Sequence, residues 1–578
     1  MVLNFHLALQ DFLQSRHSVQ HLGIHVNCSD LEILGSFLGS FQTVDPILEA
    51  NSLREASCLL IFTGPPGMDP KQVQSLTSLS ALSAYVTSVV LISGQVKERV
   101  TEPYMDEIFH IAQAKLYCKG HWLEWNSKIT TPPGLYILPG LLHHLIPNWF
   151  SCSTDLLRWI NATLLCLLPL LISRILSRFR TTPYPPKPGV KPRVRFLIPE
   201  DDIIFEAIVI SCFPITYFSG FLFYTDLSSL LAILACYDQS LVGNHIFAAL
   251  LGLWSCFFRQ TNIIWVAFIA GSAWVNRLKH LSIPPSHSHI PKTFYHDDNP
   301  EKNRCSTRMY DISLTDASFL DLPKALCDLL YKTKDQFSKI FPVLLPYTAV
   351  MACFVAFVLW NRGIVLGDKS NHLSALHIPQ FYYFAGFTSI FLAPIILDGS
   401  LIKRSIRALL GSSTSLFQTL VLCGLMIWTV DRYTYEHPFL LSDNRHYTFY
   451  VWRRIFKMHD IVKYALVPGY LLCWKLILER LARSFTANFL TSTFYIVAIT
   501  LTLVPSPLIE PRYFLVPYVL LRLHIRPVLD ETKTWPIRVF IEGCWYGLVN
   551  AITIAVFLYQ PFKSPTGEWD GTWQRFMW

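Results

Sequence analysis

The chain has 578 residues, of which 52% are hydrophobic and only 15% are charged, and 48 Lys and Arg against 40 Asp and Glu give a net charge of +8. Soluble domains typically contain about 25% charged residues. This composition excludes an ordinary soluble protein and indicates a chain that lipid solvates over much of its length. Apolar stretches recur along nearly the whole chain, so we expect one integrated helical bundle.

The apolar stretches predict membrane-spanning helices. Such a helix needs roughly 20 predominantly apolar residues, and helices must dominate because backbone groups in lipid find no water to bind. The fold class that we predict is an all-α, polytopic integral membrane protein with luminal re-entrant or amphipathic segments. About 13 candidate spans lie near residues 76–95, 155–176, 203–223, 226–242, 244–259, 261–275, 341–360, 380–398, 413–430, 461–478, 485–505, 512–524 and 538–560.

Three basic clusters set the expected orientation, because cytosolic loops are rich in Lys and Arg. They lie at 174–195, 276–340 and 403–407, and an even number of candidate spans separates each pair, so all three can face the cytosol. Residues 135–145 are then a re-entrant or interfacial segment rather than a span. The connections that face the other, luminal side are 95–155, 361–380, 431–460 and 505–512, and the chemistry is expected there.

The domain organisation follows from the same pattern. Residues 1–75 mix short apolar runs with polar breaks, and we treat them as an N-terminal extension of unknown role. Residues 76–578 form the transmembrane domain, with a cytosolic loop at about 276–340. Most of the 14 cysteines lie inside apolar runs without a CxxC pair or zinc-like spacing, so we interpret them as small core residues.

Two acidic residues open the first luminal connection. Asp106 and Glu107 precede apolar residues at helical spacing, which predicts an amphipathic helix on the membrane surface. Carboxylates at this position stabilise helix N-termini. A carboxylate at the boundary between lipid and water can also accept a proton from a sugar hydroxyl. Both interpretations remain open at this point.

Cations persist in luminal connections, where they are normally scarce. Arg445 and His446 lie in the most basic of these loops, and an arginine fork matches the oxygens of a phosphate. The alternatives for Arg445 are lipid headgroup binding or a salt bridge to Asp443. Arg259 and Arg512 lie where candidate spans meet the lumen; such charges suggest function, although an ion pair of Arg259 that only locks helices is an equal alternative.

Polar and aromatic residues in two luminal connections suggest sugar binding. Asp368, Lys369, His372 and His377 form a polar cluster of the kind that binds sugar hydroxyls or caps helices more often than it holds a metal ion, and we expect no metal. Trp125 belongs either to the aromatic belt of the membrane interface or to a surface that stacks on sugars. The chain has no P-loop, dinucleotide-binding glycine motif or nucleic-acid module, so we expect neither a cofactor nor nucleic acid as a partner.

Five blocks of sequence together resemble one enzyme family. The resemblance extends in the same order from about residue 104 to residue 578, and only Ala112, where the family has proline, and residues 1–75 depart from it. The family is the endoplasmic-reticulum alpha-1,2-glucosyltransferase that adds the last glucose to the lipid-linked oligosaccharide. The blocks are Met105–His110, Lys128–Tyr136, Phe258–Trp265, Ile364–Gln380 and His437–Arg454.

The resemblance implies a GT-C-type fold and a multi-pass protein of the endoplasmic reticulum membrane, with its active site facing the lumen. It implies transfer of glucose, with inversion, from dolichyl-phosphate-glucose to the diglucosylated, dolichyl-pyrophosphate-linked oligosaccharide. Asp106 is then the expected catalytic base, with Glu107 as the alternative. Arg445, His446, Arg259 and Arg512 are expected to bind the donor phosphate, and Trp125, Asp368, Lys369 and His372 to bind substrate.

Two other classes of membrane protein compete with this interpretation. A transporter or flippase would also be polytopic with charged residues in its spans, but such proteins often contain two related halves, and the chain shows no internal repeat. A non-catalytic partner, such as an ion-channel regulator, would need neither a luminal carboxylate nor phosphate-binding cations.

Overall fold

The computed structural model describes residues 70–183, 194–196, 198–282, 309–314, 316–318, 320–367, 369, 374–483, 488–527, 531–563 and 573–578. The chain divides into two units, Met1–Ser80 and Ala81–Trp578. The candidate site and the contacts that build it belong to the second unit. Most of the N-terminal extension at 1–75 and much of the loop at 276–340 lie outside the described residues.

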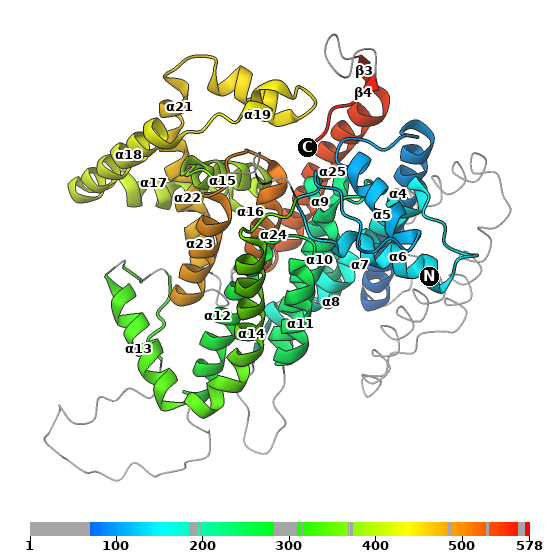
Figure 1. Ribbon diagram of the computed structural model, residues 1–578. Helices are drawn as coiled ribbons and strands as arrows, with labels where there is room; N and C mark the ends of the chain where they lie inside the picture. Colours follow the sequence, from blue (N-terminus) through cyan, green and yellow to red (C-terminus); the bar gives the residue numbers. More distant parts are fainter. Residues whose placement is uncertain are drawn as a thin grey trace, which may run out of the picture. The chain divides into compact units, whose positions relative to one another are not determined.

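Helices make up most of the described chain (Figure 1). The α-helices of the first half are α4 (Pro70–Arg99), α5 (Glu107–Cys118), α6 (Gly134–Leu145), α7 (Thr154–Phe179), α8 (Glu200–Ser211), α9 (Pro214–Ser219), α10 (Thr225–Val242), α11 (His245–Cys256) and α12 (Asn262–Leu281). Those of the second half are α13 (Asp321–Asp335), α14 (Phe337–Asn361), α15 (Pro379–Phe391), α16 (Ala393–Ile396), α17 (Gly399–Leu410), α18 (Ser413–Tyr433), α19 (Pro438–Ser442), α20 (Tyr447–Val451), α21 (Val462–Ala465), α22 (Val467–Ala482), α23 (Phe489–Leu503), α24 (Leu515–His524) and α25 (Trp535–Tyr559).

Short elements of other kinds complete the fold. A π-helical turn (Trp452–Phe456) follows α20, and a 3₁₀ turn (Pro511–Phe514) precedes α24. Two small antiparallel sheets also occur, which the all-α expectation did not include. One pairs β1 (Thr181–Pro183) with β2 (Val194–Phe196), and the other pairs β3 (Phe562–Lys563) with β4 (Trp573–Gln574).

The helices confirm a polytopic membrane protein, although not the number of 13 crossings. Each predicted span falls on helix, but some are interrupted: the span at 203–223 is divided between α8 and α9, where Pro214 cannot donate a backbone hydrogen bond to continue α8. Within the described residues, five helices are long and apolar enough to cross a membrane alone. They are Thr77–Arg99, Thr154–Phe179, Phe337–Asn361, Ser413–Tyr433 and Trp535–Tyr559.

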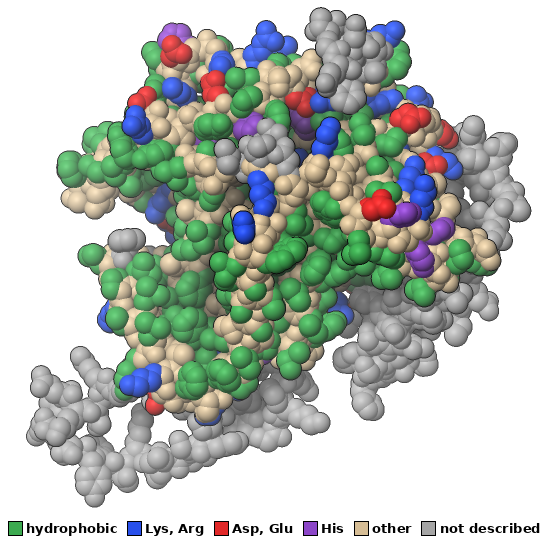
Figure 2. All heavy atoms as spheres, in the orientation of Figure 1, with side chains coloured by type: hydrophobic (Ala, Val, Ile, Leu, Met, Phe, Trp, Pro, Cys, Tyr) green, Lys and Arg blue, Asp and Glu red, His purple; other side chains and the backbone are tan. Residues whose placement is uncertain are grey.

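The surface of the bundle has the distribution of side chains expected for lipid contact. Figure 2 shows a broad hydrophobic area over the middle of one face, with many of the charged side chains gathered above it. In α18, residues such as Phe417, Leu420 and Trp428 are exposed. Because apolar surfaces of this extent are rare on soluble proteins, these helices are suited to a bilayer.

A buried ion network ties the bundle together at the end of α7 that is remote from Thr154. Glu206 forms salt bridges with Arg180 at 2.6 Å and with Arg522 at 2.8 Å, and Arg522 also binds Glu542 at 2.7 Å. All four side chains are fully buried. They join the C-terminal end of α7 to α8, α24 and α25.

Candidate active site

Three of the connections predicted to be luminal meet at one end of the bundle. Arg512 reaches Asp106 at 2.8 Å, which joins the connections 505–512 and 95–155. The backbone amide of Ala375 donates to the Pro505 carbonyl at 3.2 Å, and that of Leu366 to the Thr130 carbonyl at 3.2 Å. The connection 361–380 therefore contacts both of the others. The fourth connection, 431–460, carries Arg445 and His446 and is described below.

Asp106 occupies the turn before α5, where the preceding Met105 has a positive φ of 55°. Its side chain makes no hydrogen bond that caps α5, so the capping interpretation is not the arrangement found. The carboxylate instead pairs with Arg512 and is 41% exposed. Its partial burial raises its pKa, but the charges of Arg512 and His110 and the bond from Arg512 lower it, to about 2 overall.

Glu107 is fully buried and faces away from Asp106, into the protein. Arg158 of α7 binds both of its oxygens, with its Nε at 2.9 Å and its Nη2 at 2.6 Å. The backbone amides of Tyr104 and Phe223 donate to the same carboxylate at 3.0 and 2.7 Å. Its acceptor sites are thus occupied by the protein, and this arrangement suits a residue that holds the start of α5 in place.

Arg512 bridges two carboxylates. Its Nη1 binds Asp106, while its Nε and Nη2 bind Glu510, the latter at 3.0 Å. The loop that precedes Arg512 is held by Gln380, whose buried side chain donates to the carbonyls of Ser506 and Leu508 at 3.1 and 2.8 Å. These contacts fix the segment that carries Arg512 at the site.

Arg259 lies in the turn between α11 and α12. Its Nη2 binds Asp226 of α10 at 2.7 Å, and its guanidinium lies 5.9 Å from the ring centre of Tyr513. The helix-locking ion pair that the sequence left open is therefore present. The Nε of Arg259 is buried and has no partner among the described residues, so the side chain retains a donor beyond the pair.

Arg445 and His446 lie just before α20. Arg445 grips Asp443 with its Nε at 2.7 Å and its Nη2 at 2.8 Å, which is the salt bridge named as an alternative above. The Nδ1 of His446 donates to the Trp578 carbonyl at 2.9 Å. His446 is also close enough to Asp106 for its charge to lower the pKa of that carboxyl. The fourth connection thus borders the same site.

The residues predicted to bind substrate are only partly described. Trp125 is half-buried, its Nε1 donates to the Ile129 carbonyl at 3.3 Å, and its ring centre lies 5.9 Å from that of Tyr136. Lys369 donates to the Asn361 carbonyl at the end of α14. Asp368 and His372 lie outside the described residues.

Gly367 explains how the connection 361–380 fits against the first one. It has a φ of +62°, and a Cβ at this position would lie 2.3 Å from the Ser127 carbonyl oxygen and 2.5 Å from that of Ile129. Both the backbone conformation and the close approach require glycine. Gly367 therefore lies directly against the segment that also carries Trp125.

Several residues of the site were not singled out from the sequence. His110 forms a 2.6 Å hydrogen bond with Tyr136 of α6, and burial lowers its pKa. It follows Asp106 by four residues, a spacing that places two residues on one helix face and could have identified it. Glu510 lies two residues before its partner Arg512, and that spacing was visible in the sequence. Asp226 and Arg158 had no comparable signal, because their partners Arg259 and Glu107 are distant in sequence. Within the described residues, no group of three or more His, Cys, Asp or Glu could hold a metal ion.

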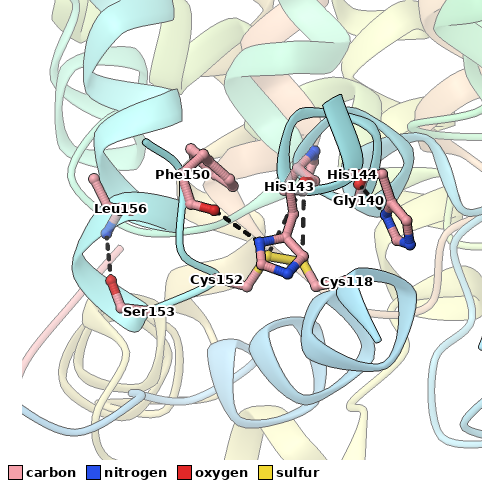
Figure 3. The surroundings of a disulfide bond; sticks show 9 residues. Cys118, Gly140, His143, His144, Phe150, Cys152, Ser153 and Leu156 are labelled. Carbon is pink, nitrogen blue, oxygen red and sulfur yellow. Dashed lines mark hydrogen bonds between the residues drawn. A yellow bond between two sulfur atoms is a disulfide. The ribbon is translucent and has the colours of Figure 1, made fainter. Parts of the chain in front are cut away.

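A disulfide bond joins Cys118, at the end of α5, to Cys152, just before α7, with their Cα atoms 6.5 Å apart (Figure 3). The ring of His143 lies beside it and donates from Nδ1 to the Phe150 carbonyl at 2.7 Å. The interpretation as core residues applied to the cysteines inside apolar runs, and it did not anticipate a disulfide between these two. Both lie outside the long apolar runs, and that position was the signal available in the sequence.

The bundle and its charged site define a class: a polytopic membrane protein with an ionised carboxylate, Asp106, paired with the guanidinium of Arg512 at one end of its helices. The particular family follows from comparison with known proteins. The chain belongs to the DIE2/ALG10 family, whose model matches residues 100–523.

Relatives along nearly the whole chain carry one name, Dol-P-Glc:Glc(2)Man(9)GlcNAc(2)-PP-Dol alpha-1,2-glucosyltransferase. The relative from Arabidopsis thaliana is 34% identical over 86% of this chain and 99% of its own length. One from Homo sapiens is 33% identical over 88% of this chain and 100% of its own length. One from Yarrowia lipolytica is 30% identical over 90% of this chain and 100% of its own length. No solved structure matches the chain.

Proposed function

We propose that this protein transfers glucose from dolichyl-phosphate-glucose to the diglucosylated, dolichyl-pyrophosphate-linked oligosaccharide and forms the terminal alpha-1,2-linked glucose. The observation that carries the proposal is the contact of Asp106 with Arg512 at 2.8 Å, in a chain that matches its relatives over nearly their full length. A base and an anion-binding group are the two parts that such a transfer needs. The fold that accompanies this function is of the GT-C type.

The proposed reaction is a single displacement with inversion. Asp106 accepts the proton of the acceptor hydroxyl while the hydroxyl oxygen forms a bond to the anomeric carbon of glucose. The bond from that carbon to the phosphate oxygen breaks, and dolichyl phosphate leaves with the electron pair. We assign the stabilisation of this negative charge to Arg445, His446, Arg259 and Arg512, because arginine forks suit phosphate oxygens. Trp125, Lys369, Asp368 and His372 bind the sugars.

Donor binding also adjusts the base. A carboxylate whose pKa is about 2 is a weak proton acceptor. A phosphate beside Arg512 compensates the positive charge that holds this pKa down, so the pKa of Asp106 rises when the donor is bound. The base becomes stronger only when the leaving group is in place, which disfavours proton transfer in the absence of donor.

Glu107 has a supporting part in this proposal. Its oxygens bind Arg158 and two backbone amides, so it orients the turn that carries Asp106 and does not itself take the proton.

We place the site in the lumen of the endoplasmic reticulum, and the protein as a multi-pass component of that membrane. Disulfides persist in the oxidising lumen and are rare in the cytosol, and the bond between Cys118 and Cys152 lies in the connection that carries Asp106. We expect peptide mapping under non-reducing conditions, on protein taken from cells with free thiols blocked, to recover the two cysteines linked. Recovery of both as blocked free thiols would contradict the luminal placement.

The reaction itself is tested with purified protein in detergent or nanodiscs. We expect conversion of the diglucosylated lipid-linked oligosaccharide to the triglucosylated form with dolichyl-phosphate-glucose, and the same rate with EDTA present, because the lipid phosphate is already a good leaving group. UDP-glucose is the matched control donor. Transfer from UDP-glucose without transfer from the lipid donor would refute the mechanism, and transfer from neither would favour a transporter or a channel regulator.

A further inference from the structure

The last described segment of the chain, residues 573–578, forms a strap across the candidate site. It begins at β4, which pairs with β3 directly after α25. The side chain of Arg575 anchors it: Nη1 donates to the carbonyls of Phe557 and Leu558 at 2.7 and 3.0 Å, and Nη2 to that of Arg99 at 2.6 Å. The strap is therefore fixed to the ends of α25 and α4, two of the helices long enough to cross a membrane.

On one side the strap binds the turn that carries the proposed base. The Tyr104 hydroxyl donates to the Arg575 carbonyl at 2.5 Å and accepts from the Arg575 amide at 2.8 Å. Tyr104 is buried, and its own backbone amide donates to Glu107 at 3.0 Å. Its phenol thus links the strap to a rigid, charged network two residues before Asp106.

On the other side the strap binds the proposed phosphate-binding pair. The Met577 amide donates to the Arg445 carbonyl at 2.9 Å, and the Gln574 Oε1 accepts from Arg445 Nη1 at 3.2 Å. The Trp578 carbonyl accepts from His446 at 2.9 Å. The strap therefore contacts both the backbone and the side chain of Arg445, in addition to the Asp443 carboxylate that grips the guanidinium at 2.7 and 2.8 Å.

We propose that the strap is a positioning element that sets the distance between the base and the donor phosphate site, with Tyr104 and Gln574 as its positioning residues. The inference rests on the proposed function, because it requires that Arg445 and His446 bind donor. Hydrogen bonds hold the strap on both sides of the site, and loss of those on either side lets the phosphate-binding pair drift relative to Asp106. Misplacement of this kind weakens donor binding most directly.

Two substitutions test the proposal in the full-length protein. Tyr104→Phe keeps the ring and removes both hydrogen bonds to Arg575, while Gln574→Met keeps the length and removes the acceptor for Arg445. Each should raise the KM for dolichyl-phosphate-glucose roughly five- to tenfold, the effect of losing one or two hydrogen bonds, and leave the KM for the acceptor unchanged. Phe562→Leu, which alters only the ring stacked 4.6 Å from Phe576, is the matched control and should change neither KM.

A double variant shows whether Gln574 acts through Arg445. Arg445→Ala should raise the donor KM, and Gln574→Met added to it should cause no further increase. A merely structural strap would lower the yield and thermal stability without changing either KM, and that result would overturn the inference. If Arg445→Ala raises the donor KM while both strap variants leave it unchanged, the strap inference fails and the proposed function stands. An unchanged donor KM in Arg445→Ala would refute the assignment of Arg445 to donor binding, and the strap inference would fail with it.

Discussion

Replacement of Asp106 by asparagine is expected to lower the rate of glucose transfer by about 10²–10⁴-fold, the usual effect of losing a positioned base. Asparagine keeps the size of the side chain but cannot accept the proton. It caps helices about as well as aspartate, so a capping role would leave the rate nearly unchanged. The measurement is turnover of the folded variant at saturating donor and acceptor.

Glu510→Gln is the matched control for this prediction. Glu510 also pairs with Arg512, with an oxygen 3.0 Å from its Nη2, so both substitutions remove one negative partner of the same guanidinium. We expect Glu510→Gln to keep substantially more activity than Asp106→Asn. A collapsed Glu510→Gln beside an active Asp106→Asn would transfer the role of base to Glu510, and normal turnover in both would refute a carboxylate base at this position.

Replacement of Arg158 by methionine is expected to destabilise the protein by about 3–5 kcal/mol, because it leaves the Glu107 carboxylate buried without a counter-ion. Arg158 and Glu107 are 5% and 0% exposed, so water cannot compensate the lost charge. Thermal unfolding in detergent, with yield of folded protein as a second readout, measures the effect. Asp155→Asn, at a more exposed position in the first turn of the same helix, is the control and should change stability little.

The double variant Glu107→Gln/Arg158→Met distinguishes the two roles considered for Glu107. It buries no charge, so it should recover most of the stability lost in Arg158→Met. If Glu107 only holds the turn before α5, the folded double variant shows measurable glucose transfer. If the double variant is stable and as inactive as Asp106→Asn, Glu107 is required for the chemistry itself and the proposal of Asp106 alone as base is wrong.

The amino-acid sequence was sufficient for the class of protein and for its family. Hydropathy and the scarcity of charge predicted membrane helices because lipid accepts only chains that satisfy their own backbone hydrogen bonds. Each of the 13 predicted spans falls on helix, and three of the connections placed on one side meet through contacts of Asp106, Thr130 and Pro505. The five blocks of resemblance predicted the family, which the matching family model confirms.

The breaks within helices were less accessible from the sequence. The run at 203–223 is continuous in hydropathy, but Pro214 begins a new helix and divides it. Whether such a pair of short helices crosses the membrane once, or enters and turns, depends on packing against neighbours, and apolar composition carries no information about that packing.

Only the tertiary structure decided which charges belong together. Asp106 and Arg512 are separated by 406 positions, and no local pattern relates them. Asp106 and Glu107 are neighbours in sequence, yet one faces the site and the other the core, because successive residues of a helix point about 100° apart. Likewise Cys118 and Cys152 form a disulfide, and residues 573–578 reach Arg445, only because folding brings distant segments within bonding distance. The hydropathy of each residue is a property of that residue alone, so the sequence is enough to predict membrane helices. Ion pairs and hydrogen bonds between segments depend on distances that only the packing of the helices sets.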